Sequence, residues 1–260
     1  MTERATSLFL GKATEYARYR VDYPESVISA ALQSVGIVRD DVIADLGSGT
    51  GMLSRWFLER GNRVFGVEPD DGMRQVAEKS LRKFGASYVS VNGTAERTSL
   101  SDSSVTVIAA GNAFHYFDAR ATRTEAERIL RPGASVLIIG HDGASQPNDF
   151  MRAYFGFIAN VAVPEARVFH EHDRSSRAME TFFGGRRFHE EDMGDHTFNL
   201  TWDGLRGRFL STSAAPVEGS LQRSAVITKL ADVFRRFEKD GTVPFQLRWR
   251  YTWGQLERTA

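Results

Sequence analysis

The chain has 260 residues, and its 33 basic and 33 acidic side chains give it a formal net charge of zero. Hydrophobic residues make up 42% and charged residues 25%, values typical of a globular protein, which argue against extended disorder. The absence of cysteine excludes a disulfide framework, a thiolate zinc site, an iron–sulfur cluster and a cysteine nucleophile.

The N-terminal segment has only Leu8–Leu10 as an apolar run, which is too short for the apolar region of a signal peptide. No stretch approaches the ~18 apolar residues that a membrane span needs. The balanced charge provides no bulk field to attract nucleic acid. We therefore expect a cytoplasmic protein whose partner is a small molecule, not a membrane or a nucleic acid. The sequence does not indicate an oligomeric state.

Aromatic and basic side chains crowd the segment YARYRVDYP (16–24), directly before the first predicted helix, Pro24–Val35. Proline suits the first turn of this helix. The segment before it is either a surface strip that covers apolar area or a lid over a ligand site. So many aromatic side chains favour the lid, in which the planar donors of Arg20 suit an anion.

Short runs rich in β-branched residues then alternate with amphipathic stretches. Near-continuous apolar strands separated by helices predict a doubly wound parallel sheet, covered on both faces. The predicted strands are Asp41–Asp45, Arg63–Glu68, Ser87–Val91, Val105–Ala110 and Ser135–Gly140, and the predicted helices between them are Gly51–Arg60, Asp70–Phe84 and Ala119–Leu130.

The rhythm changes after residue 140. An aromatic helix is predicted over Asp149–Val161, and its stripe of Phe150, Tyr154, Phe155, Phe157 and Ile158 suits either the core or one wall of a ligand pocket. The polar stretch Val168–Met193 is interpreted as a solvated loop. Beyond it we predict strands over His196–Leu200 and Val243–Trp253, which form an antiparallel hairpin, and helices over Trp202–Leu210 and Leu221–Lys239.

Four histidines fall between residues 170 and 196, close to several acidic side chains. His170 and His172 have the spacing of a possible chelate, but no second pair has the spacing of a known zinc site. We therefore predict no metal. Four arginines of the same region, Arg174, Arg177, Arg186 and Arg187, are interpreted as a solvated face in preference to an anion site.

The loop DLGSGTG (45–51) follows the first core strand and opens a helix. Glycine lets the backbone approach a ligand closely. The third glycine of the dinucleotide fingerprint is absent, because Met52 stands at its position. Asp45 suits a cationic ligand better than a pyrophosphate, and Glu68, after the second strand, can accept hydrogen bonds from both ribose hydroxyls. Together these residues favour an adenosine ligand without phosphates.

At these residues the chain resembles the class I S-adenosylmethionine-dependent methyltransferases, specifically the methyltransferase type 11 group. The resemblance implies a Rossmann-like, seven-stranded, mostly parallel sheet with an antiparallel last strand and a helical cap. The segments that carry it are DLGSGTG (45–51), VEPDDGM (67–73), NGTAE (92–96), GNAFHYFD (111–118) and ILRPGASVLII (129–139), and the leader YARYRVDYP (16–24) is similar to that of one bacterial branch.

The resemblance implies S-adenosylmethionine as cofactor and assigns its contacts residue by residue. The methionyl part would lie over Gly47, Ser48 and Gly49, next to Asn112, with its amino group on Asp45 and its carboxylate near Tyr16 and Arg20. The ribose would lie on Glu68. The adenine would lie against Pro69, Met73, Thr94, Ala95 and Glu96, with Thr94 standing where relatives usually carry an aspartate.

Methyl transfer from a sulfonium needs alignment and water exclusion more than a particular side chain, because the cofactor carries the activation. His115, just after the fourth strand, is the candidate catalytic base or acceptor-orienting group; the alternative is a packed histidine. We expect a single domain, 1–260, composed of an N-terminal lid and helix (1–40), a cofactor-binding core (41–140), a cap insertion (141–194) and closing strands and helices (195–260).

The implied reaction is transfer of a methyl group to an oxygen or nitrogen atom of a small-molecule acceptor. Two alternatives remain open. One is a module that binds S-adenosylmethionine without turnover, since these enzymes have no obligatory catalytic residue. The other is a nucleotide-dependent oxidoreductase on the same architecture, against which the missing third glycine argues.

Overall fold

A seven-stranded sheet in the order β3-β2-β1-β4-β5-β7-β6 organises the protein, whose computed structural model describes residues 11–161, 176–185, 188–216 and 219–256. Strands β1 to β5 are parallel, and β7 runs antiparallel to both β5 and β6. The predicted fold class is confirmed. The strands are β1 (Val42–Leu46), β2 (Arg63–Val67), β3 (Tyr88–Val91), β4 (Val105–Gly111), β5 (Leu130–Gly143), β6 (His189–Thr201) and β7 (Thr242–Gln255).

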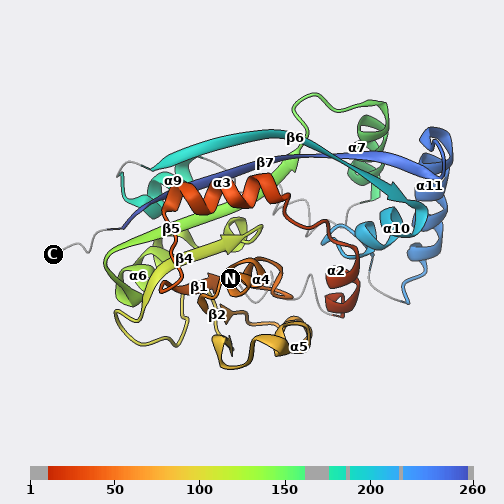
Figure 1. The fold of residues 1–260 in the computed structure, drawn as a ribbon. Coiled ribbons are helices and arrows are strands. Elements are labelled where there is room, and N and C mark those ends of the chain that lie inside the picture. Colours follow the sequence, from red (N-terminus) through yellow and green to blue (C-terminus); the bar gives the residue numbers. More distant parts are fainter. Residues whose placement is uncertain (1–10, 162–175, 186–187, 217–218, 257–260) are drawn as a thin grey trace.

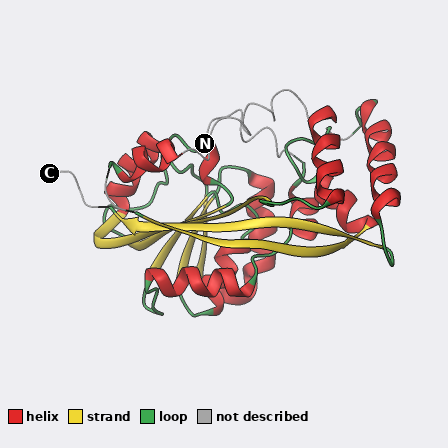
Figure 2. Ribbon diagram, turned by 90° about the horizontal axis from the view of Figure 1, so that it is seen from above, coloured by secondary structure: helices red, strands yellow, loops and turns green. Residues whose placement is uncertain are grey.

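Helices cover both faces of the sheet, as Figure 2 shows with the strands seen edge-on. Alternate residues of the strands point into two separate cores. On one face, Ile43 and Val107 pack with α3 (Glu25–Val35) and α4 (Met52–Glu59). On the other face, Ala44 and Ile108 pack with α6 (Ala119–Ile129) and α9 (Ser176–Phe183). The helices are α2 (Ala13–Tyr19), α3 (Glu25–Val35), α4 (Met52–Glu59), α5 (Asp71–Leu81), α6 (Ala119–Ile129), α7 (Asp149–Val161), α9 (Ser176–Phe183), α10 (Trp202–Leu210) and α11 (Gln222–Phe237), with 3₁₀ turns η1 (Arg82–Ser87) and η2 (Phe114–Tyr116).

Local signals set the ends of the core helices. The carboxylate of Asp70 accepts a hydrogen bond from the Met73 amide, and that of Asp118 accepts one from the Ala121 amide, so each caps its helix. Gly36 ends α3 in the left-handed conformation, at φ 72°. Because these signals are visible in the sequence, the predicted helix boundaries in this region differ from the observed ones by a few residues at most.

Strand β6 begins at His189, seven residues earlier than we predicted from the apolar alternation. A register shift between Asp192 and Gly194 interrupts the two-residue period, so the pattern is lost in this half of the strand. The cross-strand neighbours there are also charged: the Asp192 carboxylate accepts hydrogen bonds from the Arg248 guanidinium on β7. The interpretation of the whole stretch 168–193 as a solvated loop was therefore wrong.

The same stretch contains helix α9, whose apolar side chains recur on one face. Phe182 and Phe183 are fully buried beside α6, in the core on that side of the sheet. Arg177, on this helix, is among the four arginines that we interpreted as solvated, while Arg174, Arg186, Arg187, His170 and His172 lie outside the described residues.

Strands β6 and β7 pair antiparallel as predicted, but α10 and α11 lie between them in the chain, so they do not form a hairpin. The pair extends past the parallel strands and reaches α7, α10 and α11 (Figure 1). Helix α7 packs on β7 and on α11, α10 packs on β6, and α2 lies against α10. These helices form a layer, here called the cap, beside the carboxyl ends of the parallel strands. Among the described residues, no helix has both the length and the apolar character that crossing a membrane requires.

The contact between α2 and α10 depends on a glycine. A Cβ atom on Gly207 would overlap the ring of Tyr19, whose hydroxyl donates a hydrogen bond to the Asp203 carboxylate 2.9 Å away. We expect Gly207→Ala to push α2 off α10 and to destabilise the fold by about 1–3 kcal/mol, the usual cost of overpacking. Hydrogen exchange of the α2 amides should accelerate, and the midpoint of urea unfolding should fall.

Gly156→Ala is the matched control for this experiment. Gly156 lies in the interior of α7, and a Cβ atom there would meet nothing within 4 Å. We expect this variant to be as stable as the original protein or slightly more stable, since alanine favours helix. Unchanged exchange of α2 in Gly207→Ala would show that the two helices are not held by this contact.

Candidate active site

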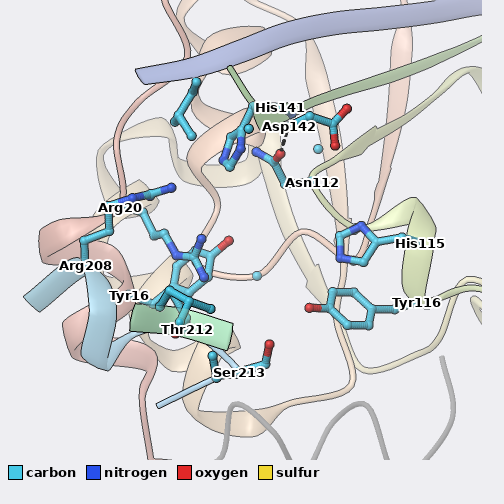
Figure 3. A pocket seen from close by; sticks show the side chains of 18 of the residues that line it. Tyr16, Arg20, Asn112, His115, Tyr116, His141, Asp142, Arg208, Thr212 and Ser213 are labelled. Carbon is cyan, nitrogen blue, oxygen red and sulfur yellow. Dashed lines mark hydrogen bonds between the residues drawn. The ribbon is translucent and has the colours of Figure 1, made fainter. Parts of the chain in front are cut away.

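A cavity of about 690 Å³ lies between the cap and the carboxyl ends of the parallel strands. Doubly wound sheets place their ligands at this edge. The lining of the cavity comes from the loops after β1, β2 and β4 and the end of β5, and from α2, α7, α10 and the loop after α10. Figure 3 shows Arg20 and Arg208 on one side and His115 on the other. A smaller recess adjoins the cavity, and Asp45, Ser48 and Tyr23 lie in its wall.

The glycines of the loop after β1 have different tasks, although all three have positive φ. A Cβ atom on Gly47 would lie 2.8 Å from the Ala113 Cβ, and one on Gly51 would lie 2.6 Å from a Leu81 methyl, so these two glycines allow close packing of the protein with itself. A Cβ atom on Gly49 would meet nothing within 4 Å, and Gly49 lines both the cavity and the recess. Gly49 is thus the glycine whose missing side chain leaves room for a ligand.

Glu68 joins two loops beneath the cavity. Its carboxylate accepts hydrogen bonds from the Gly49 amide at 3.0 Å and from the Asp70 amide at 2.9 Å. A carboxylate has about four lone-pair positions, so the two oxygens retain acceptor capacity toward the cavity that they line. Burial raises the pKa of Glu68, and the two amide hydrogen bonds oppose that shift.

Asp45, on β1, is fully buried in the wall of the recess. One carboxylate oxygen accepts a hydrogen bond from the Ser54 hydroxyl at 2.6 Å, and the other, Oδ1, has no hydrogen-bond partner. Burial raises the pKa of Asp45 to about 7, against the hydrogen bonds from Ser54, and the charge of Glu68 acts in the same direction as burial. A buried acceptor without a partner is suited to a donor supplied by a ligand.

Asn112 follows β4 with φ 54°, a conformation that non-glycine residues seldom adopt. Its side-chain oxygen accepts a hydrogen bond from the His141 amide at 3.1 Å, which ties the end of β4 to β5. Tyr23 lies close by, because a Cβ atom on Gly111 would overlap its hydroxyl. Backbone strain of this kind persists where surrounding contacts hold it, and it clusters at functional sites.

Two elements, α7 and β7, give the cavity apolar walls. Of the aromatic stripe of α7, Phe150 and Phe157 are buried in the core, whereas Tyr154, Phe155 and Ile158 also line the cavity. Phe245 and Leu247 of β7 line it as well. The stripe thus contributes to both the core and the cavity wall. His115 and Tyr116, whose ring centroids are 4.0 Å apart, lie across the cavity from Arg20 and Arg208 (Figure 3).

Most of the predicted site residues converge here. Eight line the cavity, namely Tyr16, Arg20, Gly47, Gly49, Glu68, Met73, Asn112 and His115, and Asp45 and Ser48 line the recess.

Four others line neither space. Pro69 follows Glu68 in the chain, Thr94 forms an isolated bridge with Arg97, Ala95 is buried in the core, and the Glu96 carboxylate accepts a hydrogen bond from the Asp118 amide. Their contact with an adenine stays a prediction.

Sequence reasoning missed several residues of this cavity, above all Arg208, His141 and Phe245. Arg208 lies in a short helix and His141 at the end of β5, and no motif marks either one. Phe245 was visible only as part of an alternating strand.

Within the described ranges, no group of three or more His, Asp or Glu side chains is arranged to hold a metal ion. His189, one of the described histidines, stacks on Trp253 at 4.7 Å.

The chain is similar to known methyltransferases in part of its sequence and in its fold. Residues 44–138 match the family described as methyltransferase domain. An uncharacterized methyltransferase of Mycobacterium tuberculosis is 33% identical over 139 residues, which cover 53% of this chain and 54% of that protein. One of Schizosaccharomyces pombe is 21% identical over 240 residues, 90% of each chain. The chain spans about half the length of the M. tuberculosis relative that it matches.

Solved structures show the same fold. The YcgJ protein of Bacillus subtilis superposes with a TM-score of 0.57 at 18% identity, over 91% of this chain and 100% of that one. Geranyl diphosphate C-methyltransferase of Streptomyces coelicolor, in complex with Mg²⁺, geranyl diphosphate and S-adenosyl-L-homocysteine, gives 0.51 at 17% identity, over 90% of this chain and 79% of that one.

Proposed function

We propose that this protein, which carries a methyltransferase domain over residues 44–138 on the class I fold, transfers a methyl group from S-adenosylmethionine to an oxygen or nitrogen atom of a small-molecule acceptor. The observation that carries the proposal is the unpartnered Oδ1 of buried Asp45, next to a glycine loop with open space at Gly49. An ammonium group on a ligand would satisfy that oxygen, and a phosphate would be repelled by it.

The residues present fit this cofactor. Glu68 retains acceptor capacity for two ribose hydroxyls, because its two hydrogen bonds come from backbone amides. Met73, beyond Glu68, offers an apolar surface for the adenine. At the other end, Arg20 lines both spaces and supplies a cation for the methionyl carboxylate. In this proposed placement the acidic groups would face the amine and the ribose, and the basic group would face the carboxylate.

When bound, the cofactor supplies an electrophilic methyl group on a sulfonium, which a lone pair of the acceptor displaces in line. The chain's own part is to align the two molecules and to exclude water, and alignment alone is worth effective molarities of about 10⁵–10⁸ M. The cap closes the cavity on the acceptor's side with Tyr154, Phe155 and Ile158. His115 lines the cavity and is our candidate to take a proton from the acceptor.

The test is binding followed by turnover. We expect S-adenosylhomocysteine to raise the midpoint of thermal unfolding, and NAD and NADP to leave it unchanged. A shift with NAD alone would favour the oxidoreductase alternative. A methyl-donor turnover assay with a panel of small acceptors then separates an enzyme from a non-catalytic binding module, which would bind S-adenosylhomocysteine and methylate nothing.

Glu68→Ala should weaken the binding of S-adenosylhomocysteine by about 1.5–3 kcal/mol, the range for hydrogen bonds to a charged group. The substitution removes the acceptor for the ribose and also releases the Gly49 and Asp70 amides. Calorimetric titration measures the loss. Glu68→Gln is the control, since its amide oxygen can still accept one of those bonds. Equal affinity of Glu68→Ala and the original protein would place the ribose elsewhere.

A further inference from the structure

Arg208, in the last turn of α10, is a buried charged group of the cavity wall that lacks a charged partner in the described part of the chain. The residue is 4% exposed, and its Nε and Nη1 atoms have no hydrogen-bond partner. Among the described residues it makes no ion pair, although its guanidinium lies 4.6 Å above the ring centroid of Phe245. Buried charges are otherwise paired, because leaving one unpaired is costly. The group lines the cavity, so a bound molecule can supply the missing partner.

A second cation, Arg20, lies near Arg208. Burial lowers the pKa of Arg208 to about 10, and the neighbouring charge of Arg20 acts in the same direction. Lys12 donates hydrogen bonds to the carbonyl oxygens of Thr212 and Ala215, in the loop after α10. Burial lowers the pKa of Lys12 to about 8, with Arg223 and Arg20 as further causes. Two tyrosines, Tyr154 and Tyr16, are the groups that oppose the shift of Arg208. This side of the cavity therefore attracts an anion.

The position of Arg208 separates it from the cofactor contacts. Arg20 lines both the cavity and the recess that holds Asp45, whereas Arg208 lines the cavity alone. Its neighbours include Phe245 on β7, whose ring lies under the guanidinium, and Tyr154 on α7. An anion on Arg208 therefore lies among apolar side chains, in the part of the cavity left for the acceptor.

We propose that the methyl acceptor is an apolar carboxylic acid whose carboxylate is held by Arg208, while Arg20 serves the cofactor. This inference rests on the proposed function. A planar guanidinium matches a carboxylate with two parallel hydrogen bonds. A singly charged anion suits the place better than a phosphate dianion, because Arg208 lies at the carbonyl end of α10, which carries partial negative charge.

The carboxylate is the group that is recognised, and the methylated atom lies elsewhere in the acceptor. Two hydrogen bonds from a guanidinium occupy lone pairs of the carboxylate oxygens and lower their nucleophilicity. His115 and Tyr116 line the opposite side of the cavity from Arg208, so an acceptor anchored on Arg208 extends its other end toward them (Figure 3).

The experiment compares acids with their neutral amides on the protein saturated with S-adenosylhomocysteine. Calorimetric titration uses benzoate and benzamide, 4-phenylbutanoate and 4-phenylbutanamide, and hexanoate and hexanamide, with phenyl phosphate as the phosphate arm. We expect at least one acid to bind about tenfold more tightly than its amide and more tightly than phenyl phosphate. If no acid exceeds its amide, the inference is overturned. Preference for phenyl phosphate overturns the carboxylate in favour of a phosphorylated acceptor.

Arg208→Met keeps an unbranched apolar stem as far as the position of Nε and removes the guanidinium with its charge. We expect this variant to lose the difference between acid and amide and to bind S-adenosylhomocysteine within about twofold of the original affinity. Arg208→Lys, which keeps the charge without the fork, should retain part of the difference, and it replaces Arg208→Met if that variant fails to fold. Arg206→Met, on the same helix and outside the cavity lining, is the matched control and should behave like the original protein.

The two proposals fail in different ways. If the original protein does not bind S-adenosylhomocysteine, the proposed function is wrong. The acid and amide titrations on the ligand-free protein then test the anion site by itself. Binding of S-adenosylhomocysteine with full discrimination between acid and amide in Arg208→Met would show that another group holds the anion.

Discussion

Gly49→Val is expected to lower the affinity for S-adenosylhomocysteine at least about 100-fold while most of the fold survives. The new side chain enters space that lines both the cavity and the recess, where nothing of the protein lies within 4 Å of the Cβ position. The backbone there has φ 55°, which costs a residue with a side chain about 1–2 kcal/mol. Calorimetry measures the affinity, and urea unfolding measures the cost to the fold.

Two substitutions in the same loop separate blocking from strain. Gly49→Ala carries the same backbone strain with a smaller side chain, so its affinity for S-adenosylhomocysteine should fall between that of Gly49→Val and that of the original protein. Gly51→Ala should lower the free energy of unfolding more than the affinity for S-adenosylhomocysteine. Its Cβ would lie 2.6 Å from a Leu81 methyl and would disturb packing outside the cavity. Original affinity in Gly49→Val would mean that the ligand does not lie over this loop.

Asp45→Asn is expected to weaken the binding of S-adenosylhomocysteine by about 1.5–3 kcal/mol and to remove most of its pH dependence. The ammonium of the ligand needs an ionised carboxylate, and the pKa of Asp45 is raised to about 7 by burial. In the original protein, affinity should therefore increase as the pH rises through 7. Titration at about pH 5.5 and about pH 8.5 should show a difference of roughly tenfold or more.

Stability of the ligand-free protein should change with pH in the opposite direction. The folded chain binds the Asp45 proton more tightly than the unfolded chain, whose aspartate has the ordinary value of 3.8. The free energy of unfolding should thus fall as the pH rises from about 4 to about 7. Asp45→Asn removes this contribution, and the slope that remains includes Glu68, whose pKa is also raised. A pH-independent affinity in the original protein would contradict the role of Asp45.

The side of the cavity that we propose for the cofactor could be predicted because its residues belong to local motifs. Asp45, Gly49 and Glu68 stand at the ends of strands β1 and β2, and the carboxyl ends of parallel strands meet at one edge of a sheet. The order of strands and helices is also local information, since each apolar period shows which kind of element it forms. The sequence alone therefore determined the sheet, the glycine loop and the acids beside it.

The side of the cavity that we propose for the acceptor was decided by the tertiary structure. Apolar periodicity shows which face of a helix is buried, but not which other element covers it. Arg208 and Tyr16 are nearly 200 positions apart in the chain and line one cavity only because α2 packs on α10. Arg208 looks in the sequence like any helical arginine, and its burial without a partner exists only once α10 and β7 enclose it. Whether a charged side chain can bind a ligand depends on the groups that surround it, and long-range packing brings those groups together.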